Sequence, residues 1–365
     1  MARFELMVGF GEFLTRVTTD LTNAKSRVLV QAMTFEGDAA GQSVAQAIQS
    51  SRAPDRRILV DDYTRHVIND RFLILNRNAV LHAEAASTTS MFERLIAGGT
   101  GVRVTNPVGR NPLSYPLRNH KKLLVIDQAA YLGGFNFSDH NSQWLDLMVR
   151  IDDASVSDWL AEGFANDWIG EPQPRRAAIG TVVLLDVTGN GNAASFAPVI
   201  AELCGAKESI ELISPYATFP FVDSLAVAAH RGAEVRLYTP RFNNKPIVRD
   251  YLLAVAKRSG IALRLSPTMT HAKAALIDGE KLILGSSNFD FVSNLSNSEY
   301  VIFIRDPGLI DDFTRRVLEP LRRESAAPAK HDYSRWRGFC AKAGLHLANR
   351  AVSLLRHGPR VVEWG

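Results

Sequence analysis

The sequence has little cysteine and no long apolar run, and each shortage excludes a class of protein. Only two cysteines, Cys204 and Cys340, occur among 365 residues, too few for a disulfide framework, and we expect both to be buried free thiols. The longest apolar runs, such as residues 180–185, are far shorter than the roughly 20 residues of a transmembrane helix. Residues 1–14 have no basic region leading into an apolar core, so they do not resemble a secretory signal. We therefore expect a cytoplasmic protein without a membrane span.

The composition is otherwise that of an ordinary globular protein. Hydrophobic residues make up 46% of the chain, which excludes disordered and fibrous classes. The net charge of +4 and the isoelectric point near 9.1 favour an anionic partner, such as a phospholipid surface or a nucleic acid. Many enzymes are equally basic, so the charge alone is weak evidence for either partner.

Strand-like β-branched runs alternate with amphipathic stretches along the whole chain, which predicts an α/β fold with mixed sheets. In the first half we expect strands at 27–34, 57–61, 102–104, 121–127, 130–133 and 145–151, and helices at 40–51, 90–97 and 156–168. In the second half we expect strands at 209–214, 234–238, 261–265, 272–278, 281–285 and 299–304, and helices at 197–203, 222–230, 247–259 and 311–321.

The repeated order of elements indicates internal duplication. The short stretches 23–28 and 205–210 are also similar to each other. A polar stretch with two prolines, 171–176, is typical of a join between lobes. We therefore expect two similar lobes, 1–172 and 173–323, followed by a tail at 324–365.

The second half contains a motif in which a histidine and a lysine share one face. His271 and Lys273 lie two residues apart in a strand-like run, so their side chains project together while Ala272 and Ala274 point to the core. Asp278 has the opposite parity and opens an Asp-Gly turn, so we expect it to have a structural role or to support the catalytic groups from behind. The chain then returns to Gly285-Ser286-Ser287-Asn288, where small residues allow an anion to approach the backbone and Asn288 can donate to it.

The first half repeats this pattern with one residue fewer. His120, Lys122 and Asp127 have the same spacing and are followed by Gly133-Gly134-Phe135-Asn136. Histidine and asparagine lie 16 positions apart here (136 − 120) and 17 apart in the second half (288 − 271), so we expect a shorter return strand. Asp146 and Glu299 open the next strand in each half, where each could hydrogen-bond a ring nitrogen of a histidine and fix its tautomer.

The paired His-x-Lys-x4-Asp motifs, with their trailing Gly-Ser-Ser-Asn-Phe-Asp and Asn-Ser-Glu, resemble those of the phospholipase D superfamily. The stretch Gly-Gly-Phe-Asn-Phe-Ser-Asp-His and the later Trp-Leu-Asp resemble its bacterial cardiolipin-synthase-type branch. The resemblance runs from about residue 21 to about residue 321. It implies two α/β lobes whose motifs share one active site at the lobe interface, without a metal or another cofactor.

Phosphodiester chemistry assigns a task to each side chain of the motifs. Lys122, Lys273, Asn136 and Asn288 would stabilise the non-bridging oxygens of the diester. One neutral imidazole would attack phosphorus, and a second, protonated imidazole would give a proton to the leaving alcohol. Two-lobed members of the superfamily imply His120 as the nucleophile and His271 as the acid and later the base, with a phosphohistidine intermediate.

The sequence indicates the substrate less clearly than it indicates the reaction. We expect a phospholipid at an anionic membrane surface, with water or an alcohol as acceptor, and an enzyme that is peripheral on the inner face of the cell membrane. The segment 106–119 could shape this choice through Arg110 and Arg118, although both could also be solvated arginines of an ordinary loop. A metal-independent nuclease of the same superfamily and a non-catalytic protein that binds lipids or anions are the alternatives.

The tail contains a basic amphipathic segment between residues 334 and 356. Five Lys/Arg residues and no acidic ones occur there. Apolar residues at helical spacing are Trp336, Phe339, Ala343, Leu347 and Leu354, and a second stripe holds Arg335, Lys342, His346 and Arg350. The pattern fits a helix on an anionic membrane and equally a helix that packs against its own protein.

Overall fold

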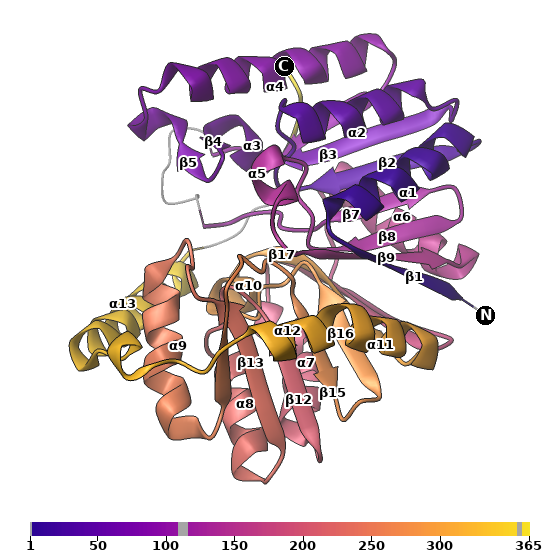
Figure 1. Ribbon diagram of the computed structural model, residues 1–365. Coiled ribbons are helices and arrows are strands. Elements are labelled where there is room, and N and C mark those ends of the chain that lie inside the picture. The colour runs from indigo at the N-terminus through magenta and orange to yellow at the C-terminus, as the bar shows by residue number, and fades with distance from the viewer. Residues whose placement is uncertain (1, 109–115, 356–359) are drawn as a thin grey trace. The chain divides into compact units, whose positions relative to one another are not determined.

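The computed structural model describes residues 2–108, 116–355 and 360–365. The chain divides into two compact units, Met1–Arg175 with His357–Gly365, and Arg176–Arg356. In each unit a mixed β-sheet is flanked by helices (Figure 1). The residues that we expected to form a separate tail, 324–365, are thus shared between the two units.

The first unit contains an eight-stranded sheet in the order β1-β9-β8-β7-β2-β3-β6-β18. The pairs β2-β3 and β3-β6 are parallel, whereas the remaining pairs are antiparallel. The strands are β1 (Arg3–Val8), β2 (Arg27–Ala32), β3 (Asp55–Asp61), β6 (Gly101–Thr105), β7 (Leu123–Ile126), β8 (Ala129–Gly133), β9 (Leu147–Asp152) and β18 (Val361–Glu363). A separate hairpin is formed by β4 (Val67–Ile68) and β5 (Arg71–Phe72).

Helices cover both faces of this sheet because its central strands are apolar on both sides. Val28 and Val30 of β2 belong to the core under three helices, α1 (Phe10–Asn23), α2 (Ala39–Ser50) and α4 (Ala79–Ala97). Leu29, which lies between them, is equally buried and faces the other way, toward α6 (Ala154–Trp168). The short helices are α3 (Tyr63–His66), α5 (Asp139–Ser142) and a 3-10 turn at Leu73–Leu75.

The second unit repeats the arrangement with the order β10-β11-β17-β16-β15-β12-β13-β14. Its strands are β10 (Arg175–Ile179), β11 (Val182–Thr188), β12 (Ser209–Ile213), β13 (Glu234–Pro240), β14 (Ala262–Ser266), β15 (Ala274–Ile277), β16 (Lys281–Gly285) and β17 (Ser298–Ile304). Its helices are α7 (Asn192–Gly205), α8 (Phe221–His230), α9 (Pro246–Ser259), α10 (Phe291–Leu295), α11 (Pro307–Phe313), α12 (Glu319–Glu324) and α13 (Arg335–Ser353), with a 3-10 turn at Lys330–Asp332.

The order of pairing confirms the duplicated α/β fold expected from the sequence. The series β1-β9-β8-β7-β2-β3-β6 of the first unit corresponds strand by strand to β11-β17-β16-β15-β12-β13-β14 of the second. Each sheet has one strand outside this series, β18 in the first unit and β10 in the second. The histidine motifs therefore introduce equivalent hairpins, β7-β8 and β15-β16.

Several elements differ from the sequence-based expectation. The first strand of each repeat, β1 and β11, was not expected, and neither was helix α1. Helix α4 begins at Ala79 rather than at residue 90, because its first half is rich in Ala, Ser and Thr and carries little apolar periodicity. The helix expected at 311–321 is divided into α11, a π-helical segment at Thr314–Leu318 and α12.

The tail folds onto the rest of the chain in two pieces. Helix α13 lies beside α9 in the second unit (Figure 1). β18 adds an antiparallel strand to β6 in the first unit. Among the described residues, no helix is both long enough and apolar enough to cross a membrane.

Candidate active site

In the second unit, the motif histidine and lysine lie in extended backbone directly before β15. The strand begins at Ala274, later than the expected start at residue 272. Ala272 and Ala274 are fully buried, as expected from the alternation of side chains. Lys273 Nζ lies 2.8 Å from His271 Nδ1 and also donates to the carbonyl oxygen of His271. The cation and the imidazole are therefore presented together.

The first unit places its motif in the same position before β7. Lys122 Nζ donates to the carbonyl oxygen of His120 at 3.0 Å. Lys121, on the opposite face, forms a buried ion pair of 2.7 Å with Asp167 of α6. Gln31 Nε2 donates to the same carboxylate oxygen at 2.7 Å. This pair was not expected from the sequence, although a lysine opposite in parity to His120 on a buried strand was a signal that an acidic partner was needed.

The one-residue difference between the hairpins lies in the turn, not in the return strand. β8 and β16 both contain five residues, so the expectation of a shorter return strand was wrong. Ile126 pairs with Ala129 across a two-residue turn, whereas Ile277 pairs with Lys281 across three residues. Each turn opens with an aspartate of positive φ, at Asp127 and Asp278.

At the histidine end the two hairpins are in the same register. Leu123 pairs with Leu132 and Ala274 with Leu284, so a glycine follows directly opposite each motif lysine. Asn136 and Asn288 each follow that glycine by three residues. The shorter first hairpin therefore does not displace Asn136 relative to its counterpart.

Glycine at this position allows the chains to approach closely. A Cβ atom on Gly133 would lie 2.2 Å from the carbonyl oxygen of Leu147, and one on Gly285 would lie 2.1 Å from that of Tyr300. A Cβ atom on Gly134 would lie 2.1 Å from a carboxylate oxygen of Asp146. Gly134 thus leaves room for the carboxylate of Asp146, in addition to the expected role in substrate binding.

The carboxylates that open the next strands are buried beside the motifs. Glu299 accepts hydrogen bonds from the hydroxyl groups of Ser286 and Ser293, the latter at 2.8 Å. Ser286 also accepts from the backbone N–H of Tyr300 at 3.0 Å. In the first unit, Asp146 accepts from the backbone N–H of Leu147 at 2.8 Å. Ser286, expected to bind substrate, therefore has a hydroxyl engaged with Glu299.

The two asparagines share an unusual feature. Asn136 and Asn288 are both buried, and the Oδ1 atom of each has no hydrogen-bond partner among the described residues. A buried amide without its full set of partners is costly unless a ligand supplies them. Ser287 accepts from the backbone N–H of Phe289 at 3.3 Å. The structure therefore leaves hydrogen-bonding capacity in equivalent places of both units.

Asp127 and Asp278 lie at the far end of their hairpins, away from the histidines. Seven residues of extended chain separate each aspartate from its histidine, which is about 20 Å. Asp278 accepts from the backbone N–H groups of residues 207, 208 and 209, and Asp127 accepts from those of residues 25, 26 and 27. Each aspartate thus joins the turn to the start of the neighbouring strand and does not reach the reacting groups.

Arg118 is not the solvated loop arginine that the sequence allowed. It is buried and pairs with Asp61 at the end of β3, with 2.7 Å between Nη1 and Oδ1. Asp61 also accepts from the backbone N–H of Asn119 at 2.7 Å and from the side chain of Asn106. Asp61, whose role was not expected from the sequence, holds the segment that leads to His120. Arg110 lies outside the described residues.

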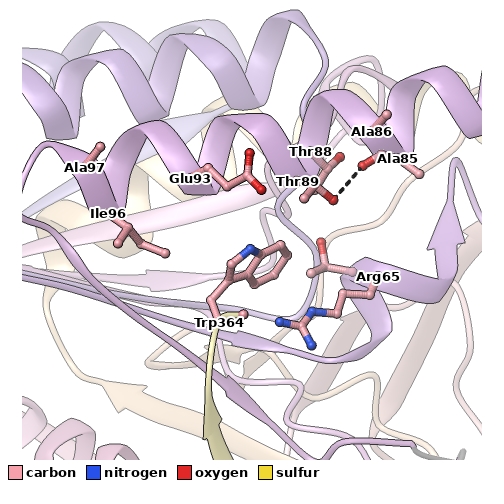
Figure 2. A pocket seen from close by; sticks show the side chains of 11 residues that line it. Arg65, Ala85, Ala86, Thr88, Thr89, Glu93, Ile96, Ala97 and Trp364 are labelled. Atoms are coloured by element: carbon pink, nitrogen blue, oxygen red, sulfur yellow. Dashed lines mark hydrogen bonds between the residues drawn. The ribbon is translucent and has the colours of Figure 1, made fainter.

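Other features of the first unit lie apart from the motif residues. A cavity of about 720 Å³ is bounded by Arg65, by the face of α4 from Ala85 to Ala97 and by Trp364 (Figure 2). Three carboxylates, from Glu36, Asp38 and Glu84, have oxygen atoms within 4.8 Å of one another. This is the one cluster of the described residues with the ligand types and spacing for a metal ion, and it contains no motif residue.

Comparison with known proteins shows the family and the fold of this chain. A family model described as "Cardiolipin synthase, PLD-like domain" matches residues 17–168 and 199–319, which is more than half of the chain. The chain belongs to this family. The two matched segments contain the histidine, lysine and asparagine of both motifs.

Individual relatives are cardiolipin synthases of bacteria. Cardiolipin synthase 1 of Staphylococcus epidermidis is 25% identical over 88% of this chain and 67% of its own length. The major cardiolipin synthase of Bacillus subtilis is 25% identical over 80% of this chain and 63% of its own length. The chain therefore spans only about two thirds of the curated relatives that it matches.

A solved structure shows the same fold. The phosphatidylserine synthase of Haemophilus influenzae superposes with a TM-score of 0.74 at 16% identity, covering 97% of this chain and 95% of that one. The chain thus has the fold and both motifs of a phospholipase D-type phosphodiesterase or phosphatidyltransferase, as the sequence indicated.

Proposed function

We propose that the protein cleaves or transfers phosphodiesters of phospholipids, as a phospholipase D-like enzyme of the cardiolipin synthase type. The observation that carries the proposal is the equivalence of the two half-sites. Each presents a histidine, a lysine and a buried asparagine in the same register before and after equivalent hairpins. The relatives' names supply the class of substrate.

The reaction would proceed in two steps through a covalent intermediate. A ring nitrogen of His120 attacks phosphorus, and the bond from phosphorus to the headgroup oxygen breaks. His271 gives its proton to that oxygen, and then takes a proton from the incoming water or alcohol as this attacks phosphorus and releases His120. Water yields a phosphatidic-acid-type monoester, whereas an alcohol yields a new diester. Both half-sites thus take part in one reaction.

The neighbouring groups would lower the barrier by stabilising charge and orienting the rings. Lys122 and Lys273 each lie against the backbone of their own histidine and would offset negative charge on the diester oxygens. Asn136 and Asn288 would donate from their side-chain Nδ2 groups to the same oxygens, with the hydroxyl group of Ser287 beside Asn288. Asp146 and Glu299, the latter held by two serines, would orient the imidazoles.

The substrate is tested by incubating the protein, with a chelator present, with phosphatidylglycerol, phosphatidylethanolamine and plasmid DNA, and identifying products by mass spectrometry. We expect lipid products that do not depend on a metal ion. DNA cleavage without lipid turnover would overturn the lipid assignment in favour of a nuclease, and no turnover at all would favour a binding protein. Loss of activity to the chelator would overturn the metal-independent mechanism.

The shared reaction is tested by removing each histidine. We expect His120→Ala and His271→Ala each to lower kcat by at least about a thousandfold, because the covalent step and the proton transfer depend on both groups. His230→Ala, an exposed histidine of α8, is the matched control and should keep full activity. Substantial activity in either motif variant would contradict the two-histidine mechanism.

A further inference from the structure

Helix α13 uses one face to pack on its own unit and leaves the opposite face to solvent. Gly338, Ala341, Leu345 and Val352 are its buried residues. A Cβ atom on Gly338 would lie 2.7 Å from the Cβ of Ala254 in α9, so the two helices lie in close contact. The helix is therefore held firmly, and its outer face is a fixed surface.

The outer face of α13 is apolar. Trp336, Phe339, Leu347 and Leu354 have exposed fractions of 72%, 64%, 70% and 80%. They are the apolar stripe expected from the sequence, and the packing on α9 uses a different stripe. The rings of Trp336 and Phe339 stack with centroids 6.0 Å apart. Large apolar side chains gathered on one exposed helix face mark an interaction surface.

Cations border this apolar face. A groove of about 610 Å³ between α9 and α13 is lined by Lys257, Arg258, Arg335 and Lys342, next to Phe339. Arg350 is exposed further along α13. In the described part of the chain, no ion pair engages any of the four cations that line the groove.

The acidic residues of the groove are already paired. Asp332 contacts Arg241 and Arg249, at 3.5 and 2.7 Å, and Asp250 lies 4.0 Å from Arg337. Residues 334–355 contain no acidic side chain. The groove and the border of the apolar face therefore carry a net positive charge.

We propose that this face, consisting of the apolar stripe of α13 and the cationic groove beside it, docks the protein on an anionic phospholipid bilayer. Trp336, Phe339, Leu347 and Leu354 would enter the boundary between headgroups and acyl chains, while the groove cations contact lipid phosphates. A tryptophan suits this boundary because its ring is apolar and its N–H is polar. The choice of a lipid surface rests on the proposed function, which requires access to phospholipid.

The charge pattern disfavours a second copy of the chain as the occupant. A two-fold contact places the same surface on both partners. The cations along α13 would then face their own copies, with no acidic residue of the helix between them. An anionic bilayer, in contrast, is complementary to the groove and tolerates the apolar stripe.

Binding to vesicles of phosphatidylglycerol and phosphatidylcholine, measured by co-sedimentation at low salt, tests the proposal. The wild-type chain should bind vesicles that contain phosphatidylglycerol, bind pure phosphatidylcholine far more weakly, and lose affinity as salt is added. The double variant Arg335→Gln/Lys342→Gln should weaken binding roughly 25-fold, about fivefold for each charge. Trp336→Ala/Phe339→Ala should weaken it by at least about tenfold, because apolar area no longer leaves water.

The matched controls change exposed side chains in another part of the chain. Ile74→Ala/Leu75→Ala removes two apolar side chains that are 91% and 83% exposed, and Arg52→Gln/Arg77→Gln removes two exposed cations. Both control pairs should bind vesicles as the wild type does. Circular dichroism should show that these variants remain folded, since none of the side chains that they change is buried.

The outcomes separate this proposal from the proposed function. His271→Ala should bind vesicles normally while losing turnover, and the face variants should keep turnover on lipid dispersed in detergent. Vesicle binding without any turnover by the wild type would remove the proposed function and leave the docking surface standing. Face variants that bind vesicles like the wild type would overturn the docking surface. So would analytical ultracentrifugation that shows the wild type as a dimer and the face variants as monomers.

Discussion

Replacing Glu36 with glutamine should stabilise the protein, and increasingly so as the pH rises. Glu36 lies between β2 and α2, only 3% exposed, and accepts a hydrogen bond from the backbone N–H of Asn69 at 3.2 Å. Burial raises its pKa to about 9, and the nearby carboxylates of Asp38 and Glu84 add to the effect. Glutamine has the same shape, still accepts from Asn69, and has an amide that can donate to Glu84.

The magnitude follows from the difference between the folded and unfolded pKa. Above pH 4.5 the unfolded chain releases the proton while the folded chain keeps it, so the free energy of unfolding falls as the pH rises toward 9. Each pH unit above 4.5 costs about 1.4 kcal/mol, so the penalty at pH 7 is at most about 3.5 kcal/mol. Near pH 4.5 it is below about 0.5 kcal/mol.

Urea unfolding at pH 4.5 and pH 7, followed by tryptophan fluorescence, measures this difference. All tryptophans except Trp336 lie in the first unit, which also contains Glu36, so the signal reports mainly on that unit. Glu36→Gln should gain stability over the wild type at pH 7 and almost none at pH 4.5. Glu93→Gln, on the exposed side of α4, is the control and should follow the wild type. Parallel pH profiles for Glu36→Gln and the wild type would refute the reasoning.

Three further predictions concern the hairpins. Although partial burial acts against it, hydrogen bonds from backbone N–H groups hold the pKa of Asp278 below its usual value. Asp278→Ala should therefore cost about 1–2 kcal/mol of unfolding free energy at pH 7. Because the stabilisation is present above the unfolded pKa, this cost should shrink in urea titrations below about pH 4; a constant cost would contradict the assignment. Lys121→Met should cost about 3–5 kcal/mol by leaving Asp167 buried and unpaired, and Lys121→Met/Asp167→Leu should recover most of it in the same titration; a double variant as unstable as the single would refute this. A glycine inserted after Asp127 lengthens a turn about 20 Å from His120, so kcat should change less than about twofold; a large loss would show that the turn length matters to the site.

The composition of the half-sites was predictable because side chains on extended backbone alternate. His271 and Lys273 lie two residues apart, and the 2.8 Å contact between Lys273 Nζ and His271 Nδ1 agrees with side chains that project from the same face. The duplicated order of strands was equally visible, since the same apolar runs recur in both halves. Local sequence was sufficient for both inferences.

Features that depend on pairing across the sheet could not be predicted. The first hairpin is one residue shorter than the second, and only the register of strand pairing shows that the difference lies in the turn rather than in β8. Lys121 pairs with Asp167, which is 46 residues away in the sequence and lies on a helix whose packing the sequence does not specify. Arg118 and Asp61 are 57 residues apart and meet only because β3 ends beside the segment that precedes His120.

The face of α13 that packs on α9 was also beyond prediction. Apolar spacing indicated the stripe of Trp336 and Leu347, but that stripe is the exposed one. The buried stripe contains Gly338 and Ala341, whose small side chains give a weak hydrophobic signal while allowing close helix contact. Apolar spacing alone therefore did not identify the buried face.

Trapping the intermediate tests the central claim most directly. The protein would be mixed rapidly with phosphatidylglycerol, quenched at neutral or alkaline pH, where a phosphohistidine survives, and digested for peptide mass spectrometry. We predict a phosphatidyl adduct on the peptide that contains His120, enriched in His271→Ala if His271 is needed to release it. Product formation without an adduct on either histidine peptide would contradict the covalent mechanism, and an adduct on His271 alone would reverse the two roles.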